Sequence, residues 1–347
     1  MNLLRIFAVA AALLALFVWG FFSSPFADHE DVGPPEREPA VRDNFYDVAM
    51  RDDFAWIVGY HGTILRSQDR GVSWQLQQSG TSEPLFRISL VSADEAWISG
   101  GYGTILHTSD GGKSWHKQQT GIEEHLFGIN FIDESRGWAV GSRGAVLSTD
   151  DGGATWVNRS LGDDVTLNDV RFVDSKQGWA VGEFGRIYHT RDGGLHWEKQ
   201  NSPVEVAFTS GTSRNLFRLL SNAQELWAFG LDGVILTSKD GVKWTTAAMA
   251  DSSSGAAKQY HLFSASSAGP KQWAVGERGT ILVSSGDGNW HESGVKTLPS
   301  NLNGVAFGSD GTGLIVGNRG TILRSDNGGT RWTPVKIALT HTSSAVN

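Results

Sequence analysis

Tryptophan recurs along this chain in two interleaved series with a nearly constant step. One series advances by 41 to 47 residues and comprises Trp74, Trp115, Trp156, Trp197, Trp244, Trp290 and Trp332. The other comprises Trp56, Trp97, Trp138, Trp179, Trp227 and Trp273, with Leu314 where a seventh member would fall. A period of about 40–50 residues made of short strands is typical of propeller blades. Seven copies therefore predict an all-β fold, a seven-bladed β-propeller over residues 43–335.

The third copy shows how many strands each blade contains. Residues 126–131 alternate apolar with small or polar side chains, as a strand does, and residues 138–141 form a second apolar run. Residues 142–144 make a tight turn that ends in glycine, and a third run covers residues 145–148. A fourth strand follows Trp156, so the pattern predicts four-stranded blades.

The turn between the third and fourth strands follows the Asp-box pattern S/T-x-D-x-G-x-x-W. It is complete at residues 67–74, 108–115, 149–156 and 190–197, and it decays in later copies. The aspartate can accept hydrogen bonds from turn amides, the glycine supplies an unusual φ, and the tryptophan buries a large ring. A structural role is therefore predicted for Asp69, Asp110, Asp151, Asp192 and Asp240. One carboxylate per turn is far from the cage of about six to eight oxygens that calcium needs, so neither a metal nor a cofactor is expected.

Composition excludes several classes of protein. The formal net charge of −8 argues against a nucleic-acid binder, which needs a basic face. The chain has no cysteine, and this excludes disulfides, cysteine–zinc sites and a lipid-modified cysteine.

The N-terminal segment predicts export. Residues 6–22 are almost all apolar, Arg5 precedes them, and acidic residues begin at Asp28. Residues 1–27 are predicted to be a hydrophobic helix that is either an uncleaved membrane anchor or a removed signal peptide. The proline-rich residues 28–42 are predicted to be a stiff linker, and residues 336–347 form a C-terminal tail.

The repeat also carries a family resemblance. The run from Leu126 through Gly-Trp-Ala-Val-Gly at residues 137–141 to the Asp box at residues 149–156 resembles the photosystem II stability/assembly factor family. The resemblance extends over about residues 45–332 and implies a seven-bladed Asp-box propeller outside the cytoplasmic membrane or in the thylakoid lumen. Cyanobacterial members typically carry a lipid-anchored cysteine, whereas this chain has its apolar N-terminal segment instead. The expected location is the periplasmic or thylakoid-lumen side, free or anchored in the inner membrane.

Propeller topology assigns the turns to two faces. Hairpins between second and third strands lie on one face, here called the hairpin face, and Asp boxes lie on the other, the Asp-box face. The hairpin tips keep their glycines but differ in chemistry, as a recognition surface does. Partner contacts are predicted from the tips Arg143, Arg278, Arg319, Tyr102 and Phe184, with simple solvation of the tips as the alternative.

The innermost strands supply a second candidate surface around the central channel. The aligned positions are Asp47, Arg87, Gly128, Asp169, Arg218, His261 and Gly304, with Arg171 two residues beyond Asp169. Arg87, Arg171 and Arg218 predict a positive patch, and arginine suits carboxylates and protein interfaces. The family resemblance implies that such a patch receives an acidic or C-terminal segment of a membrane protein. The alternative is that these arginines pair with Asp47 or Asp169.

Two functions from different classes remain. The first is a non-catalytic, monomeric scaffold that assists assembly or stability of a membrane protein complex, with no catalytic residue assigned. The second is a carbohydrate-binding or sialidase-like glycoside hydrolase propeller, because Asp boxes also occur in those proteins. A sialidase needs an early Arg-Ile-Pro element, and the nearest string here is Arg87-Ile88-Ser89. Hydrolysis would also need two carboxylates about 5–10 Å apart.

Overall fold

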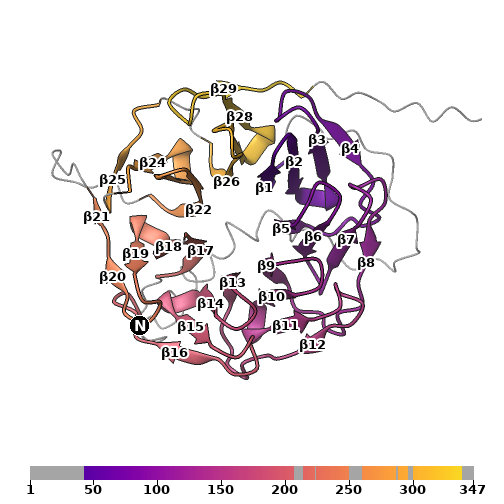
Figure 1. Ribbon diagram of the computed structural model, residues 1–347, viewed down its shortest axis with the longest axis vertical. Helices are drawn as coiled ribbons and strands as arrows, with labels where there is room; N and C mark the ends of the chain where they lie inside the picture. Colours follow the sequence, from indigo (N-terminus) through magenta and orange to yellow (C-terminus); the bar gives the residue numbers. More distant parts are fainter. Residues whose placement is uncertain are drawn as a thin grey trace, which may run out of the picture.

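The computed structural model describes residues 43–206, 214–222, 224–249, 260–286, 288–295 and 300–337. Seven sheets are arranged radially around a central channel (Figure 1), which confirms the predicted seven-bladed propeller of four-stranded blades. The predicted N-terminal helix and linker lie outside the described residues. Within the ranges that are described, no helix is long and apolar enough to cross a membrane.

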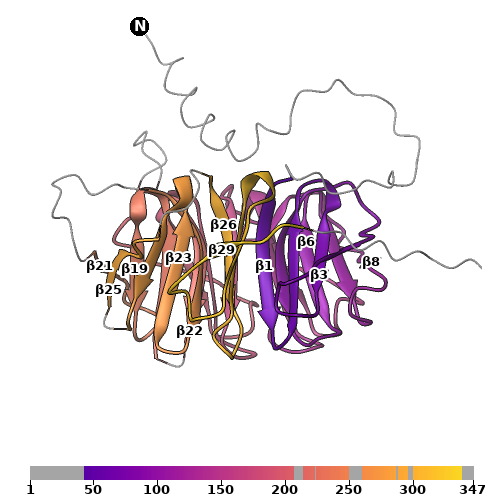
Figure 2. The same cartoon turned by 90° about the horizontal axis from the view of Figure 1, so that it is seen from above.

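Each blade is an antiparallel sheet of consecutive strands, and its strands run roughly along the channel axis (Figure 2). The innermost strands are β1 (Phe45–Arg51), β5 (Leu85–Leu90), β9 (Leu126–Phe131), β13 (Leu167–Phe172), β17 (Leu216–Ser221), β22 (Leu262–Ala268) and β26 (Leu302–Phe307). The second strands are β2 (Phe54–Gly59), β6 (Ala96–Gly100), β10 (Gly137–Gly141), β14 (Gly178–Gly182), β18 (Leu226–Gly230), β23 (Lys271–Gly276) and β27 (Gly313–Gly317).

The outer strands are shorter. The third strands are β3 (Ile64–Ser67), β7 (Ile105–Thr108), β11 (Val146–Thr149), β15 (Ile187–Thr190), β19 (Ile235–Ser238), β24 (Ile281–Ser284) and β28 (Ile322–Ser325). The fourth strands are β4 (Gln75–Gln77), β8 (His116–Lys117), β12 (Val157–Asn158), β16 (Glu198–Gln200), β20 (Thr245–Thr246), β25 (Asn289–Glu292) and β29 (Thr333–Pro334). In blade six, β21 (Ala248–Met249) adds a fifth strand that runs parallel to β25 and links the rims of blades five and six.

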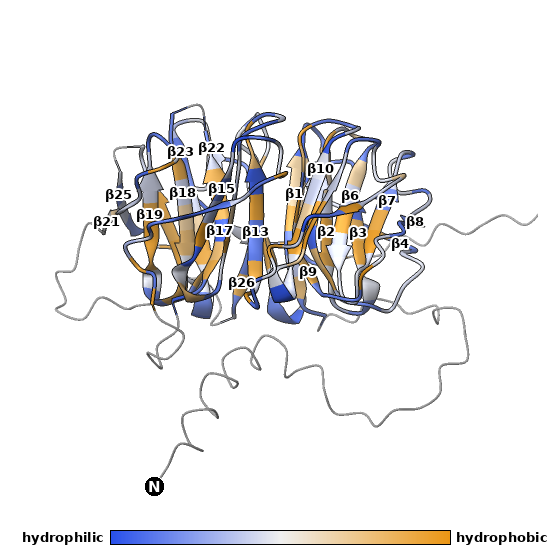
Figure 3. Ribbon diagram, turned by 90° about the horizontal axis from the view of Figure 1, so that it is seen from below, coloured by the Kyte–Doolittle hydropathy of each residue, from blue (hydrophilic) through white to orange (hydrophobic). Residues whose placement is uncertain are grey.

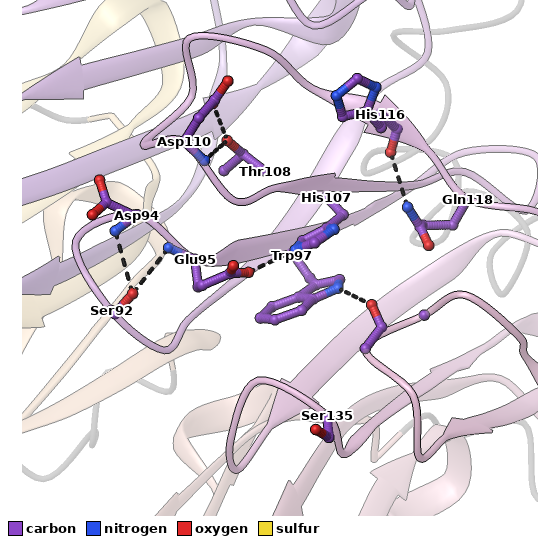
Figure 4. Close-up of polar contacts among 12 residues, drawn as sticks. Ser92, Asp94, Glu95, Trp97, His107, Thr108, Asp110, His116, Gln118 and Ser135 are labelled. Atoms are coloured by element: carbon purple, nitrogen blue, oxygen red, sulfur yellow. Dashed lines mark hydrogen bonds and ion pairs between the residues drawn. The ribbon is translucent and has the colours of Figure 1, made fainter.

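The second-strand tryptophans join neighbouring blades. Trp97 donates its indole N–H to the carbonyl oxygen of Gly152 in the next blade at 3.0 Å (Figure 4). It also stacks on Phe131 of that blade, with ring centroids 3.8 Å apart. On its other face His107 stacks at 4.4 Å and pairs with Glu95 at 2.7 Å. The apolar side chains of the strands fill the spaces between sheets, while the turns at both ends are hydrophilic (Figure 3).

The fourth-strand tryptophans are less uniform than the sequence suggested. Trp74 and Trp290 are fully buried, as expected. Trp156 and Trp197 are only partly buried, so the expectation of a deeply buried ring in every Asp box was wrong for these two blades. Their rings meet Phe131 and Phe172 edge-on instead, because those phenylalanines already stack flat against the second-strand tryptophans.

The first and last blades of the ring are each built from four consecutive strands, β1–β4 and β26–β29, so neither contains a strand from the other end of the described chain. Side chains join the two blades. Asn303 donates its Nδ2–H to the carbonyl oxygen of Phe45 at 2.8 Å, and Arg70 pairs with Asp310 at 3.1 Å. Leu314 replaces the missing tryptophan and packs beside Gly71 of blade one, within a shared apolar cluster. Closure therefore depends on packing and on these polar contacts.

Candidate functional site

Four charged side chains from four blades meet across the channel. Arg87 Nη1 lies 3.6 Å from Asp47 Oδ1, and Arg87 Nε lies 3.8 Å from Asp169 Oδ1. Arg218 contacts the same two carboxylates at 3.8 and 3.9 Å. Asp47 is 1% exposed, Asp169 5% and Arg87 8%, so the cluster is buried. The structure thus brings Arg87 and Arg218 into the ion pairs that the sequence left as an alternative to partner binding.

A shared register brings these residues to one level of the channel. In each innermost strand a β-bulge follows the first residue, and the residue after the bulge pairs with the residue just before the glycine that ends the second strand. Asp47 Oδ2 accepts the N–H of Ile88 at 3.2 Å, and Asp169 Oδ2 accepts the N–H of Leu219 at 2.8 Å. Each aspartate therefore also joins its blade to the next one.

The predicted alignment of blade six was wrong by three residues. Ser264, and not His261, occupies the ring position, because Ser264 pairs with Val275 just as Arg87 pairs with Ser99. Ser264 Oγ accepts the N–H of Val305 in the next blade at 3.3 Å, which repeats the role of the two aspartates. His261 lies at the hairpin-face end of its blade, one residue before β22.

Arg171 is the member of the predicted patch that pairs with no carboxylate of the described residues. Its Nε donates to Ser221 Oγ at 3.0 Å, and it forms no ion pair within the described part of the chain. Burial and the nearby positive charge of Arg218 lower the pKa of Arg171, yet arginine remains protonated at neutral pH. Three guanidinium groups therefore face two carboxylates, and one positive charge is uncompensated.

Arg171 lines a cavity of about 450 Å³ in the channel. The lining runs from the charged cluster to the ends of the innermost strands, where Ile132, Val173 and Phe307 stand near the Asp-box face. Asn130 also lines it, and its Oδ1 accepts the N–H of Phe172 at 2.7 Å. The cavity can admit an anionic group from this face, because Arg171 offers N–H donors that no carboxylate occupies.

The remaining predicted partner residues lie at the other end of the molecule. Tyr102, Arg143, Phe184, Arg278 and Arg319 each occupy the middle of a hairpin tip, with φ between 50° and 61°. His61 and Asp232 do the same in the two remaining blades. This left-handed region is unfavourable for non-glycine residues, and such strain often accompanies a functional site. Because these tips lie at the hairpin face and Arg171 lines the channel toward the Asp-box face, the structure does not bring the tips together with the channel arginines.

Side chains of the following blade hold most of these tips in place. Tyr102 donates its backbone N–H to His125 Nδ1 at 3.1 Å, and Asp232 donates to His261 Nδ1 at 3.1 Å. An asparagine plays this part for three other tips, in the pairs Phe184 with Asn215, Arg278 with Asn301 and Arg319 with Asn44. The backbone of each such tip is fixed, while Tyr102, Arg143, Arg278 and Arg319 expose their side chains.

The sequence reasoning missed a set of aromatic residues at the hairpin-face end of the channel. They occupy the bulge of the innermost strands and comprise Tyr46, Phe86, Phe127, Phe217 and Phe263. Asn168 and Asn303 hold the equivalent positions in blades four and seven. The repeated Leu-Phe pair that opens four of the innermost strands was the available signal.

The Asp boxes form closed hydrogen-bond networks. In blade three, Asp151 accepts from Thr149 Oγ1 at 2.8 Å, from Thr155 Oγ1 at 2.7 Å and from the Thr155 N–H at 2.9 Å. These bonds lower the pKa of Asp151 to about 2. Asp69, Asp110, Asp192 and Asp240 make corresponding bonds. Among the residues that the structure describes, no three histidine or carboxylate side chains cluster as metal ligands.

Comparison with protein families gives one match that covers most of the chain. The family model described as photosynthesis system II assembly factor YCF48 matches residues 37–120, 113–168, 160–269 and 247–326. No curated protein sequence matches.

Solved structures share the fold. A structure described as YCF48 bound to D1 peptide superposes with a TM-score of 0.64 at 23% identity, over 87% of this chain and 99% of that one. YCF48 from Cyanidioschyzon merolae gives 0.64 at 18% identity, over 84% and 98%. The GH74 xyloglucanase from Xanthomonas campestris gives 0.65 at 10% identity, over 84% of this chain and 53% of the enzyme. At these identities the likeness concerns the propeller fold alone.

Proposed function

The chain belongs to the photosynthesis system II assembly factor YCF48 family, and from that premise we propose that it is a non-catalytic propeller that binds a segment of a membrane protein and assists assembly of its complex. A relative in the same family has been solved with a D1 peptide bound. The corresponding ligand here is an acidic or C-terminal peptide segment of a membrane protein.

Arg171 carries this proposal. It faces a cavity that reaches the Asp-box face, it has a single hydrogen bond to Ser221, and no described carboxylate pairs with it. An uncompensated, half-buried charge is unfavourable, so a ligand carboxylate that pairs with Arg171 would gain a strong, charge-assisted contact. Arg87 and Arg218 add to the positive potential, although each already shares Asp47 and Asp169.

Two features favour a scaffold over a glycoside hydrolase. The two channel carboxylates, Asp47 and Asp169, are each engaged by two arginines and by a backbone amide. Neither is therefore available as the acid or the nucleophile of a hydrolytic pair. The apolar residues 6–22 also favour a protein that acts outside the cytoplasmic membrane, free or anchored, close to a membrane client.

The test is recovery of the client from cells. Full-length tagged protein would be cross-linked in intact cells and purified from membranes, and the proteins that co-purify would be identified by mass spectrometry. We expect one membrane complex to be recovered with the wild-type chain and lost with Arg171→Met. Lys176→Met is the matched control, because Lys176 is exposed beyond the same innermost strand and its loss removes the same charge.

The outcomes separate clearly. Recovery of the same complex with Arg171→Met as with wild type would exclude the cavity as the binding site. Recovery of no specific protein would reject the scaffold function, provided the tagged protein is folded and reaches the membrane fraction.

A further inference from the structure

The hairpin-face end of the channel carries a continuous cluster of aromatic rings on blades one to three, here called the aromatic track. Ring centroids of Tyr46 and Phe86 are 6.0 Å apart, and those of Phe86 and Phe127 are 5.0 Å apart. His125 joins Phe127 at 6.1 Å and Tyr102 at 4.7 Å. None of the five rings is fully buried, and Tyr102 is 50% exposed.

The fold holds this track open at the mouth of the channel. The backbone oxygen of Asn44 accepts the N–H of the hairpin residue Tyr60, so β1 starts at the hairpin face. Tyr46, the second residue of β1, therefore lies close to that face. The charged cluster of Asp47, Arg87, Asp169 and Arg218 crosses the channel one residue deeper. The track and the arginine cavity are therefore at opposite ends of the channel.

Acidic residues adjoin the track. Glu83 lies beside the Tyr102 hairpin, since a Cβ added to Gly101 would stand 3.2 Å from Glu83 Oε2. Glu124 accepts the N–H of Gly103 through its backbone oxygen, on the other side of Tyr102. Glu123 is exposed and Glu124 half-buried, and neither forms an ion pair with a described residue. Asp43 stands at the blade-one end, where its backbone oxygen accepts the N–H of Gly320. The tips Arg143 and Arg319 lie at the two edges of this sector.

Two electrostatic effects determine which ligand such a surface binds. The negative face of an aromatic ring attracts a cation within about 6 Å, and tyrosine and phenylalanine both serve. A carboxylate rim adds a charge of the same sign and repels anionic segments. Burial, with the charges of Tyr60 and Asp43, raises the pKa of Tyr46, so its phenol remains neutral at physiological pH.

We propose that the aromatic track, with Glu83, Glu123 and Glu124, binds a lysine or arginine side chain from a segment of a partner protein. The ligand has the opposite charge to the one assigned to the arginine cavity, and it binds the opposite face. One partner can then be held at two points, a cationic residue at the hairpin face and an anionic group at the Asp-box face. The hairpin-face site does not require the arginine cavity to be occupied.

The position of Tyr102 supports the assignment. Tyr102 adopts φ 50° in a hairpin where glycine or asparagine would be unstrained, and it keeps half its surface exposed. Its N–H bond to His125 fixes the backbone and seats the phenol ring against the imidazole. A large aromatic ring that is held in place and left half exposed is available for contact with a cation.

The experiment uses full-length protein in dodecyl maltoside and fluorescein-labelled peptides of sequence Ser-Leu-Lys-Leu-Ser. Norleucine or glutamate at the central position gives the neutral and anionic controls. Fluorescence anisotropy should show binding of the lysine peptide about ten-fold tighter than the norleucine peptide, with weaker binding still for glutamate.

The chain offers matched variants for this site. Phe86→Asn and Phe127→Asn introduce the residue that blades four and seven carry at the same bulge, as Asn168 and Asn303, so the fold tolerates it. Either variant should weaken lysine-peptide binding at least about five-fold, as should Glu83→Gln combined with Glu123→Gln and Glu124→Gln. Phe217→Asn, on the far side of the ring, and Arg171→Met should leave it unchanged, with thermal midpoints confirming folding throughout.

Three results would overturn the proposal. Equal affinity for the norleucine peptide would make the track a plain apolar groove. Binding of phosphocholine, without binding of the lysine peptide, would assign it to a lipid headgroup. Binding lost equally in Phe217→Asn would place the ligand elsewhere. Failure of the wild-type chain to recover any client in the cross-linking experiment, with lysine-peptide binding retained, would reject the proposed function and leave this site standing.

Discussion

Trp138 and Gly193 form a hydrogen bond across the boundary between blades three and four, with the indole N–H 2.8 Å from the carbonyl oxygen. Gly193 belongs to an Asp box, so the tryptophan of one blade holds the turn of the next. Trp97 and Trp179 make the same bond to Gly152 and Gly241. At three boundaries a second-strand tryptophan thus holds the Asp box of the next blade. Trp56 instead bonds Gln77 of its own blade, and the Trp273 indole N–H has no hydrogen-bond partner among the described residues.

The first prediction separates packing from hydrogen bonding at this boundary. Trp138 is 2% exposed and stacks on Phe172 at 3.5 Å, so Trp138→Ala should lower the free energy of unfolding by about 3–5 kcal/mol. Trp138→Phe keeps a ring but leaves the Gly193 carbonyl without its donor, and should cost about 1–3 kcal/mol. Guanidinium denaturation of both variants provides the measurement. A Trp138→Phe variant as stable as wild type would show that the bond contributes nothing.

The second prediction concerns the channel arginines. Arg87→Met leaves Asp47 and Asp169 with only Arg218, and it should destabilise the protein by about 3–5 kcal/mol, as breaking a buried ion pair does. Arg171→Met removes a charge that no carboxylate balances, so stability should stay the same or rise slightly. Thermal unfolding of the two variants side by side checks the contrast. Equal losses in both would mean that Arg171 is also structural.

The sequence predicted the fold well because the fold repeats. Each glycine hairpin, Asp box and tryptophan recurs, so seven copies support the same interpretation. Ring closure was beyond reach, since Arg70 and Asp310 are more than two hundred residues apart and carry no repeat signal.

Site geometry was predicted less well. In blade six His261 was aligned three residues before the ring position, although Leu262-Phe263 opens this strand as Leu85-Phe86 opens β5 and points to Ser264. A β-bulge also shifts the register of each innermost strand by one residue. The same bulge places Phe86 and Phe127 at the channel mouth, although a strictly alternating strand predicts otherwise. Cross-channel pairing of Arg87 with Asp169 depends on ring diameter, which no local pattern encodes.

The third prediction is a pH dependence that originates at His125. Its Nδ1 must be unprotonated to accept the N–H of Tyr102, and burial lowers the pKa of His125 in the folded protein. The unfolded chain therefore binds a proton more readily, with a pKa of about 6.5. The stabilisation is complete above that value and is lost as the pH falls below it, toward the folded pKa.

His125→Asn tests this directly. Asn44, Asn215 and Asn301 already accept the same tip N–H in other blades, so asparagine should preserve the contact. The difference in thermal midpoint between wild type and His125→Asn should move in favour of the variant as the pH is lowered from 7.5 to 5. A constant difference across that range would show that His125 does not titrate with unfolding.

The last prediction concerns acid stability of the Asp boxes. The N–H of His196, followed by the imidazole and Thr190, lowers the pKa of Asp192 to about 2, and hydrogen bonds from Thr155 and Thr149 do the same for Asp151. The pKa of an aspartate in the unfolded chain is about 3.9, so each box contributes stability above that pH and loses it as the pH falls toward 2.

Asn327 shows the neutral alternative in blade seven, where its Oδ1 accepts from Ser325 Oγ and from the Arg331 N–H at 2.9 Å each. The double variant Asp151→Asn, Asp192→Asn should therefore be somewhat less stable than wild type at pH 6, and this deficit should shrink as the pH is lowered to 2.5. Thermal midpoints at constant ionic strength measure it, and a deficit that grows on acidification would contradict the assigned role.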